Sequence, residues 1–185
     1  TGDAVADVLF GKITPSGKLT TTFPRSVGQL PLFYNHLNTG RPDPDSHIFN
    51  RYASNYLDES NEPLYPFGYG LSYTDFVYGE LQISSETLPK NGELTVSVTV
   101  TNKGNYDGYE TVQLYLHDIY AEIARPVKEL KGFERVFLKS GESRDVKFVI
   151  TEDDLKFYNS ELHYVYEPGE FDVMVGPNSR DVQTK

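Results

Sequence analysis

The sequence predicts a mainly β protein: residues 76–185 form a β-sandwich of about seven strands, and a helix, a strand and a long loop precede it. Short runs that alternate apolar and polar residues recur after residue 76, at the spacing of an all-β sandwich. The chain of 185 residues also contains 14 Tyr and 11 Phe. Aromatic side chains favour half-buried pleated surfaces over helix interiors.

Residues 3–10 predict one short helix, and residues 18–23 an isolated strand. Asp3 can cap the helix, Gly11 can end it in the left-handed conformation, and one helical face is apolar (Val5, Val8, Leu9). A lone helix and strand cannot bury their apolar faces. Because the chain also begins without an initiator Met, we interpret it as a fragment that starts in the last αβ unit of a domain.

The periodicity fades between about residue 26 and residue 66, where Pro, Asn, Asp, Ser and Gly dominate. A long stretch of this kind is usually either a functional loop or a linker. Flexible linkers are rich in Gly and Ser, whereas this one carries many large apolar side chains (Phe33, Tyr34, Phe49, Tyr52, Tyr56, Leu57, Leu64, Tyr65). We therefore expect a loop packed against a neighbouring domain.

The clearest strand lies at residues 94–100, where apolar and polar side chains alternate so that one face points to a core. Three further apolar stripes imply that the core is shared (Val112, Leu114, Leu116; Val146, Phe148, Ile150; Phe171, Val173, Val175). Turns between the stripes supply Gly or Asn for positive φ and predict short antiparallel strands (residues 90–92, 102–104, 106–108, 139–141, 167–169). Residues 151–155 predict a capped helical turn that bridges the two sheets.

Composition narrows the range of partners and cofactors. A net charge of -10 and a pI near 4.8 oppose binding to nucleic acid or to an anionic membrane surface. The sequence contains no cysteine, which excludes disulfides and thiolate metal sites, and it contains no apolar run of membrane-spanning length. The four His residues lack a zinc-ligand spacing, and the acidic clusters, such as Asp43 with Asp45, lack the calcium-loop pattern. We expect no metal and no cofactor.

Three segments of this sequence closely resemble family 3 glycoside hydrolases of the bacterial periplasmic β-glucosidase type. They are GDAVADVLFGKITPSGKLTTTFP at 2–24, PLYPFGYGLSYTDF at 63–76 and RPVKELKGFERVFLKSGES at 125–143. The resemblance implies an enzyme with a barrel, then an α/β sandwich domain, then a fibronectin type III-like domain. It divides this chain into the end of the α/β sandwich domain (1–35), an interdomain loop (36–75) and the fibronectin type III-like β-sandwich (76–185).

The resemblance also implies a retaining exo-β-glycosidase that acts on oligosaccharides or aryl β-glycosides, in the periplasm or secreted. Such enzymes use an Asp nucleophile and a Glu acid/base. The nucleophile is followed by Trp in the family motif, and this chain contains no Trp. The family's acid/base Glu precedes the helix at residue 3. We therefore assign no catalytic residue, and expect the chain to depend on the missing barrel and α/β domains for activity.

Four residues in the loop at 47–62 are candidate substrate-binding residues: Arg51, Tyr52, Tyr56 and Asp58. The resemblance extends to this Arg-Tyr and aromatic-Asp pattern, and such side chains can hydrogen-bond sugar hydroxyls when packing holds them. The alternative is an Arg–carboxylate pair that only orders the loop. For residues 66–76, the glycines and aromatic residues favour domain docking over sugar stacking.

The predicted fold is also compatible with a function other than that of a glycosidase. Fibronectin-like sandwiches often act in recognition, and a fold does not dictate a function. The chain could therefore be a carbohydrate-binding or adhesion module, a reading that a row of exposed aromatic residues would favour. A spacer or dimerisation domain is a third alternative.

Overall fold

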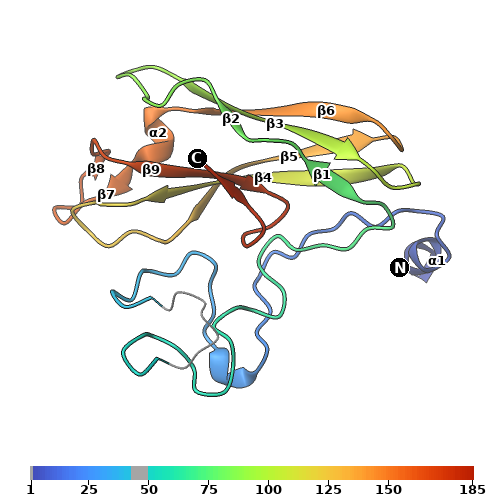
Figure 1. Ribbon diagram of the computed structural model, residues 1–185, viewed down its shortest axis with the longest axis horizontal. Coiled ribbons are helices and arrows are strands. Elements are labelled where there is room, and N and C mark those ends of the chain that lie inside the picture. Colours follow the sequence, from blue (N-terminus) through green and yellow to red (C-terminus); the bar gives the residue numbers. More distant parts are fainter. Residues whose placement is uncertain (1, 43–49) are drawn as a thin grey trace.

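The computed structural model describes residues 2–42 and 50–185. Two four-stranded antiparallel sheets face each other (Figure 1). The first contains β1 (Phe76–Tyr78), β2 (Gln82–Ile83), β3 (Leu94–Asn102) and β6 (Ser143–Ile150). The second has the order β10-β9-β4-β5 and contains β4 (Gly108–Asp118), β5 (Glu129–Leu138), β9 (Phe171–Gly176) and β10 (Gln183–Thr184). The predicted β-sandwich is confirmed.

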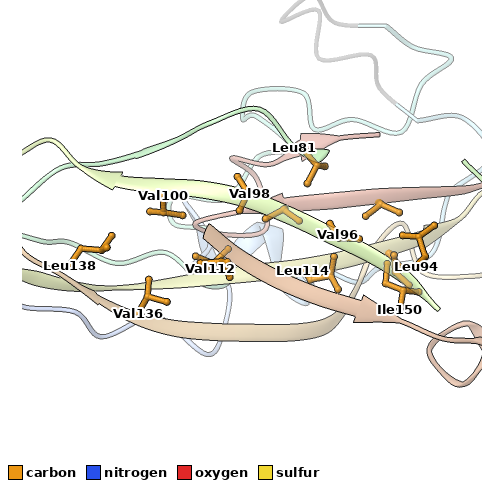
Figure 2. Close-up of a cluster of buried hydrophobic side chains, with 14 residues drawn as sticks. Leu81, Leu94, Val96, Val98, Val100, Val112, Leu114, Val136, Leu138 and Ile150 are labelled. Atoms are coloured by element: carbon orange, nitrogen blue, oxygen red, sulfur yellow. The ribbon is translucent and has the colours of Figure 1, made fainter. Parts of the chain in front are cut away.

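The core lies between these sheets, where the alternating apolar residues meet (Figure 2). On β3 the side chains of Val96, Val98 and Val100 are buried, and the Thr and Ser residues between them face outward or are half-buried. Each fully buried Val or Leu stabilises the fold by about 1.5–3 kcal/mol relative to an exposed one. Of the four predicted stripes, only Phe171 lies outside the buried cluster and the residues packed against it.

The predicted helical turn forms α2 (Glu152–Leu155), which follows β6 at one end of the sandwich (Figure 1). The backbone N–H of Thr151 donates to Asp154 Oδ2 at 2.8 Å, which satisfies a donor at the helix start. Leu155 packs against the core from the end of this helix. The chain then forms a hairpin from β7 (Phe157–Tyr158) and β8 (Tyr164–Val165) before it enters β9.

The turn predictions are partly wrong. Asn91 (φ 54°) and Gly141 (φ 77°) adopt the expected left-handed conformation, but the described glycines at 104, 108 and 169 do not. Gly104 serves close approach instead, since a side chain there would meet Thr74 Oγ1 and the backbone of Asp75. The strands are also longer than expected, because β3, β4 and β5 run for 9, 11 and 10 residues.

The N-terminal segment begins with α1 (Gly2–Leu9), and Gly11 ends it with φ 73° as predicted. Asp3 lies within the first turn of the helix, so its assignment as the capping residue is wrong. No residue of this helix is buried, and the side chains of Leu9 and Phe10 are 72% and 87% exposed. The helix therefore presents apolar surface with nothing in the described chain to cover it.

The predicted strand at residues 18–23 does not form. The segment runs beside residues 65–69 but pairs at only two points: Leu19 N donates to Tyr69 O at 2.7 Å, and Phe23 N donates to Tyr65 O at 2.9 Å. Between these points the carbonyl of Phe67 accepts from Ser179 N, at 2.9 Å, on the sandwich. Pro66 has no N–H to donate. The ladder is interrupted because its middle rung is used to dock the segment onto the β domain.

Two long strands form the open edges of the sandwich on one side. In the described pairings β6 joins only β3, and β5 joins only β4. Both edges carry charged side chains along their length (Lys131, Glu134, Arg135 on β5; Arg144, Asp145, Lys147 on β6). Charged residues at such positions oppose pairing with a further strand.

Candidate functional site

Residues 67–70, within the segment between α1 and β1, lie against the outer face of the second sheet. Because side chains alternate along β4, the residues between the core positions point to this outer face. Gln113 Nε2 donates to the carbonyls of Gly68 (3.2 Å) and Pro177 (2.7 Å), and Gln113 Oε1 accepts from Tyr115 OH (2.6 Å). The docked segment is thus held by a fully buried amide.

Aromatic rings complete this contact. Tyr34 stacks on Phe67 with ring centroids 4.3 Å apart, and its edge meets the ring of Tyr115 at 5.8 Å. Burial raises the pKa of Tyr115 well above its usual value. Gly70 lies so close to the carbonyl of Gly17 that any side chain would collide with it. Residues 67–70 therefore join the two parts of the chain through packing.

A buried ion pair fastens the same segment further along β4. Lys18 Nζ lies 3.1 Å from Glu110 Oε1, with side chains 17% and 6% exposed. The hydroxyl of Tyr78 also donates to Glu110 Oε1, at 2.8 Å. Burial, and next the charge of Glu110, raise the pKa of Tyr78, so the phenol stays protonated and acts as a donor. The three groups satisfy one another at a site with little exposure to water.

The base of the candidate loop is organised by Gln29, at the end of the 3-10 helix η1 (Val27–Gln29). Its side chain is buried and makes hydrogen bonds in two directions: Nε2 donates to Ser60 O at 2.7 Å, and Oε1 accepts from the backbone of Arg25. Arg25 Nε in turn donates to Glu62 O at 3.0 Å. A buried amide that makes bonds of this kind fixes the C-terminal end of the loop against residues 25–29.

The four predicted site residues lie above this base. Arg51, Tyr52 and Asp58 are exposed, and Tyr56 is held by a hydrogen bond from its hydroxyl to Gln29 O, at 3.4 Å. In the described part of the chain neither Arg51 nor Asp58 forms an ion pair, so the described contacts that order the loop come from other residues. Phe49, His47 and the pair Asp43 and Asp45 lie outside the described residues.

Gln29 and Arg25 were missed by sequence reasoning. The signal available was a single amide between two apolar residues, in Val27-Gly28-Gln29-Leu30. A Gln in a polar loop is normally exposed. The burial of Gln29 depends on the carbonyls of Ser60 and Glu62, which lie 31 and 33 positions further along the chain. Nothing in the local pattern specifies that contact.

The loop also lies close to the start of β5. Lys128 Nζ donates to Ser179 O at 2.6 Å. Burial lowers the pKa of Lys128, and the charge of Glu62 opposes this shift.

No group of three or more His, Asp or Glu residues in the described ranges is arranged to hold a metal ion. None of the helices in those ranges has the length and apolar character needed to cross a bilayer.

Two family descriptions match this chain. Residues 1–73 match the C-terminal domain of glycosyl hydrolase family 3, and residues 110–179 match a fibronectin type III-like domain. A periplasmic β-glucosidase of Salmonella typhimurium is 52% identical over 98% of this chain and 24% of its own length. A β-xylosidase of Formosa agariphila is 45% identical over 97% of the chain and 24% of its own length.

Solved structures agree with these matches. The crystal structure of a β-glucosidase from Listeria innocua superposes with a TM-score of 0.91 and 48% identity, over 100% of this chain and 25% of that one. A β-glucosidase from Erythrobacter marinus gives 0.88 and 41%, over 100% and 23%. The chain thus spans about a quarter of the length of the relatives it matches.

Proposed function

We propose, from the premise that this chain belongs to the C-terminal part of the family 3 glycoside hydrolases, that it is the non-catalytic end of a retaining exo-β-glycosidase acting on β-linked glucosides. The observation that carries the proposal is similarity to named β-glucosidases over 98% to 100% of the chain. The sequence has no Trp, and so cannot contain the Asp-Trp motif of the family nucleophile. Hydrolysis would need the carboxylates of the preceding domains.

The direct test is an assay of the purified chain on an aryl β-glucoside. We expect no turnover by the chain alone, and turnover by the parent enzyme under the same conditions. Activity that follows the purified chain through successive columns would contradict the proposal. Under the proposal, residues 1–35 belong to the end of the α/β domain, 36–75 to an interdomain loop and 76–185 to the β-sandwich, in a periplasmic or secreted enzyme that resembles its Salmonella relative.

The loop at 47–62 is the part of this chain that we propose to reach substrate, through Arg51, Tyr52, Tyr56 and Asp58. Support comes from an exposed set of hydrogen-bonding side chains above a base fixed by buried Gln29. An ordered base lowers the entropy lost when the side chains bind a sugar. Arg51 and Asp58 are also free of ion pairs with other described residues.

Substitution in the parent enzyme tests this role. Tyr52→Ala and Arg51→Ala should each raise KM for an oligosaccharide roughly fivefold, because a lost hydrogen bond is worth about 1 kcal/mol. Leu57→Ala is the matched control, since Leu57 is 80% exposed in the same loop but has no group that can hydrogen-bond a hydroxyl. Unchanged KM in the first two variants would remove the loop from the substrate path and leave the non-catalytic assignment intact.

One observation favours the carbohydrate-binding alternative as a second candidate. Tyr158 and Tyr164 are directly paired across the β7–β8 hairpin, with exposed rings 5.0 Å apart. Exposed aromatic rings at such a tip can contact the apolar faces of sugars. Titration of the chain with cello-oligosaccharides, followed by tyrosine fluorescence, distinguishes the candidates. Saturable binding that Tyr164→Ala abolishes would favour the binding module, and no change would exclude it.

A further inference from the structure

Two buried charged groups at the end of the sandwich carry polar atoms without a hydrogen-bond partner among the described residues. They are Asp118, the last residue of β4, and Arg125, in the connection between β4 and β5. Their side chains are only 5% and 10% exposed, yet Asp118 Oδ2 and Arg125 Nε each lack a partner. A buried charged atom left in this way destabilises the fold more than a neutral polar group does.

The two atoms lie 3.9 Å apart, which is too far for a hydrogen bond. Other contacts hold the guanidinium in place. Its Nη2 donates to Glu129 Oε1 at 3.1 Å, and its Cζ lies over the ring of Phe157, 4.4 Å from the centroid. Glu129 is itself fixed by Lys131 Nζ, at 2.7 Å. Arg125 cannot move toward Asp118 without losing these contacts.

A small cavity lies at this point. Its volume is about 10 Å³, and besides Asp118 and Arg125 its lining includes three further charged residues (Glu129, Lys131, Asp154). A space of this size is about the minimum that holds one water molecule. Two atoms 3.9 Å apart can both lie within about 2.8–2.9 Å of a third atom placed between them. The separation of the two atoms thus suits a bridge of one water molecule, and the cavity that they line is large enough to hold one.

The chemistry of the lining selects the occupant. It must accept a hydrogen bond from an N–H group and donate one to a carboxylate oxygen. The lining holds both signs of charge, so a cation would meet like charges on Arg125 and Lys131, and an anion would meet the carboxylates (Asp118, Glu129, Asp154). We propose that a single ordered water molecule occupies this cavity and bridges Asp118 Oδ2 to Arg125 Nε, so that the connection between β4 and β5 is fastened to the sheet through it.

A high-resolution crystal structure of this chain is the first test. We expect one electron-density peak within hydrogen-bonding distance of both Asp118 Oδ2 and Arg125 Nε, with the occupancy and height of water. A direct contact between the two side chains, with no peak between them, would overturn the proposal. A peak with the density or coordination of an ion would overturn it equally.

A solution measurement on the unchanged chain provides independent evidence. In an NMR experiment that detects transfer between water and side-chain protons, the Nε proton of Arg125 should show a direct contact with a long-lived water. Arg144 is the matched control, because it also pairs with a Glu, at 3.1 Å, but its side chain is 48% exposed. Equal behaviour of the two arginines would count against a bound water at Arg125.

Discussion

The β-sandwich and the segment that precedes it differ in where their apolar side chains lie. The sandwich encloses Val, Leu and Ile side chains between its two sheets, and 14 of them form one buried cluster. In the preceding segment, several large apolar side chains are exposed on the surface (Leu9, Phe10, Val27, Phe33, Leu57, Leu71). The first region has a core of its own, whereas the second is shaped by fixed contacts to the sandwich at Lys18, Phe67 and Gly68.

This difference shows that order does not require a core. The segment before β1 has only α1 and one short 3-10 helix among its described residues, and yet Gln29, Gln113 and Glu110 each hold it by buried polar contacts. Its exposed apolar surface is of the kind that marks contact with another protein surface. The sandwich should therefore fold alone, and the segment should need a neighbour to bury what it displays.

The largest expected effect compares one leucine from each region. Leu138→Ala should lower the free energy of unfolding by about 2–5 kcal/mol, because it removes a fully buried side chain and leaves a cavity. Leu71→Ala, at a residue 70% exposed, should change it by less than about 0.5 kcal/mol. Urea unfolding followed by circular dichroism measures both. Similar losses would mean that the segment has a core of its own.

The junction between the regions should respond almost as strongly. Lys18→Met removes the partner of Glu110 and leaves a carboxylate that is 6% exposed without its counter-charge, which should cost about 3 kcal/mol. The control is Lys12→Met, whose pair with Asp7 is at the same kind of distance, 3.0 Å, but with Lys12 73% exposed. That change should cost less than about 1 kcal/mol. Hydrogen exchange at Leu19 and Tyr69 would report whether docking is lost.

The smallest effect concerns pH. Burial raises the pKa of Asp118; Arg125 and His117 oppose the shift, and Glu167 and Glu129 add to it. The folded state thus binds the proton more tightly than the unfolded state, so this contribution to stability is present below the unfolded pKa and is lost as pH rises through the raised folded value. Asp118→Asn should therefore be more stable than the unchanged chain at neutral pH, with the gain shrinking toward about pH 4.

Asp58→Asn is the control for this prediction, because Asp58 is exposed in the loop. Because exposed side chains contribute little to stability, this substitution should change the unfolding free energy by less than about 0.5 kcal/mol. Urea titrations at several pH values provide the measurement. A constant difference between Asp118→Asn and the unchanged chain would mean that Asp118 titrates alike in the folded and unfolded states.

Periodicity predicted most of the sandwich, because burial between two sheets depends on alternation within a strand, which is local. The segment at residues 18–23 shows where this stops. Its composition favours a strand. However, the carbonyl of Phe67, which lies opposite the middle of the segment, accepts a hydrogen bond from Ser179 instead, and both residues are far along the chain. The glycines at 104 and 108 were misread in the same way, since their neighbour Thr74 comes from another part of the fold.

The candidate site was predictable to a smaller degree. Arg51, Tyr52, Tyr56 and Asp58 came from resemblance to a family pattern, and their role in binding stays a prediction. What holds Tyr56 could not be read from the sequence, because Gln29 becomes buried only when Ser60 and Glu62 present their carbonyls to it. Local patterns report which side chains can bond, and tertiary structure decides which of them meet.

The charged residues on the two edge strands affect how these molecules associate at high protein concentration. A foreign strand that added itself to β6 would have to place its backbone beside Arg144, Asp145 and Lys147, and one on β5 beside Lys131, Glu134 and Arg135. Mixed charges at these positions impose a repulsion or a desolvation penalty on nearly any strand from another molecule that pairs with these edges. Fibre-like stacking of these molecules is thereby discouraged, even though the long backbone edges themselves stay accessible.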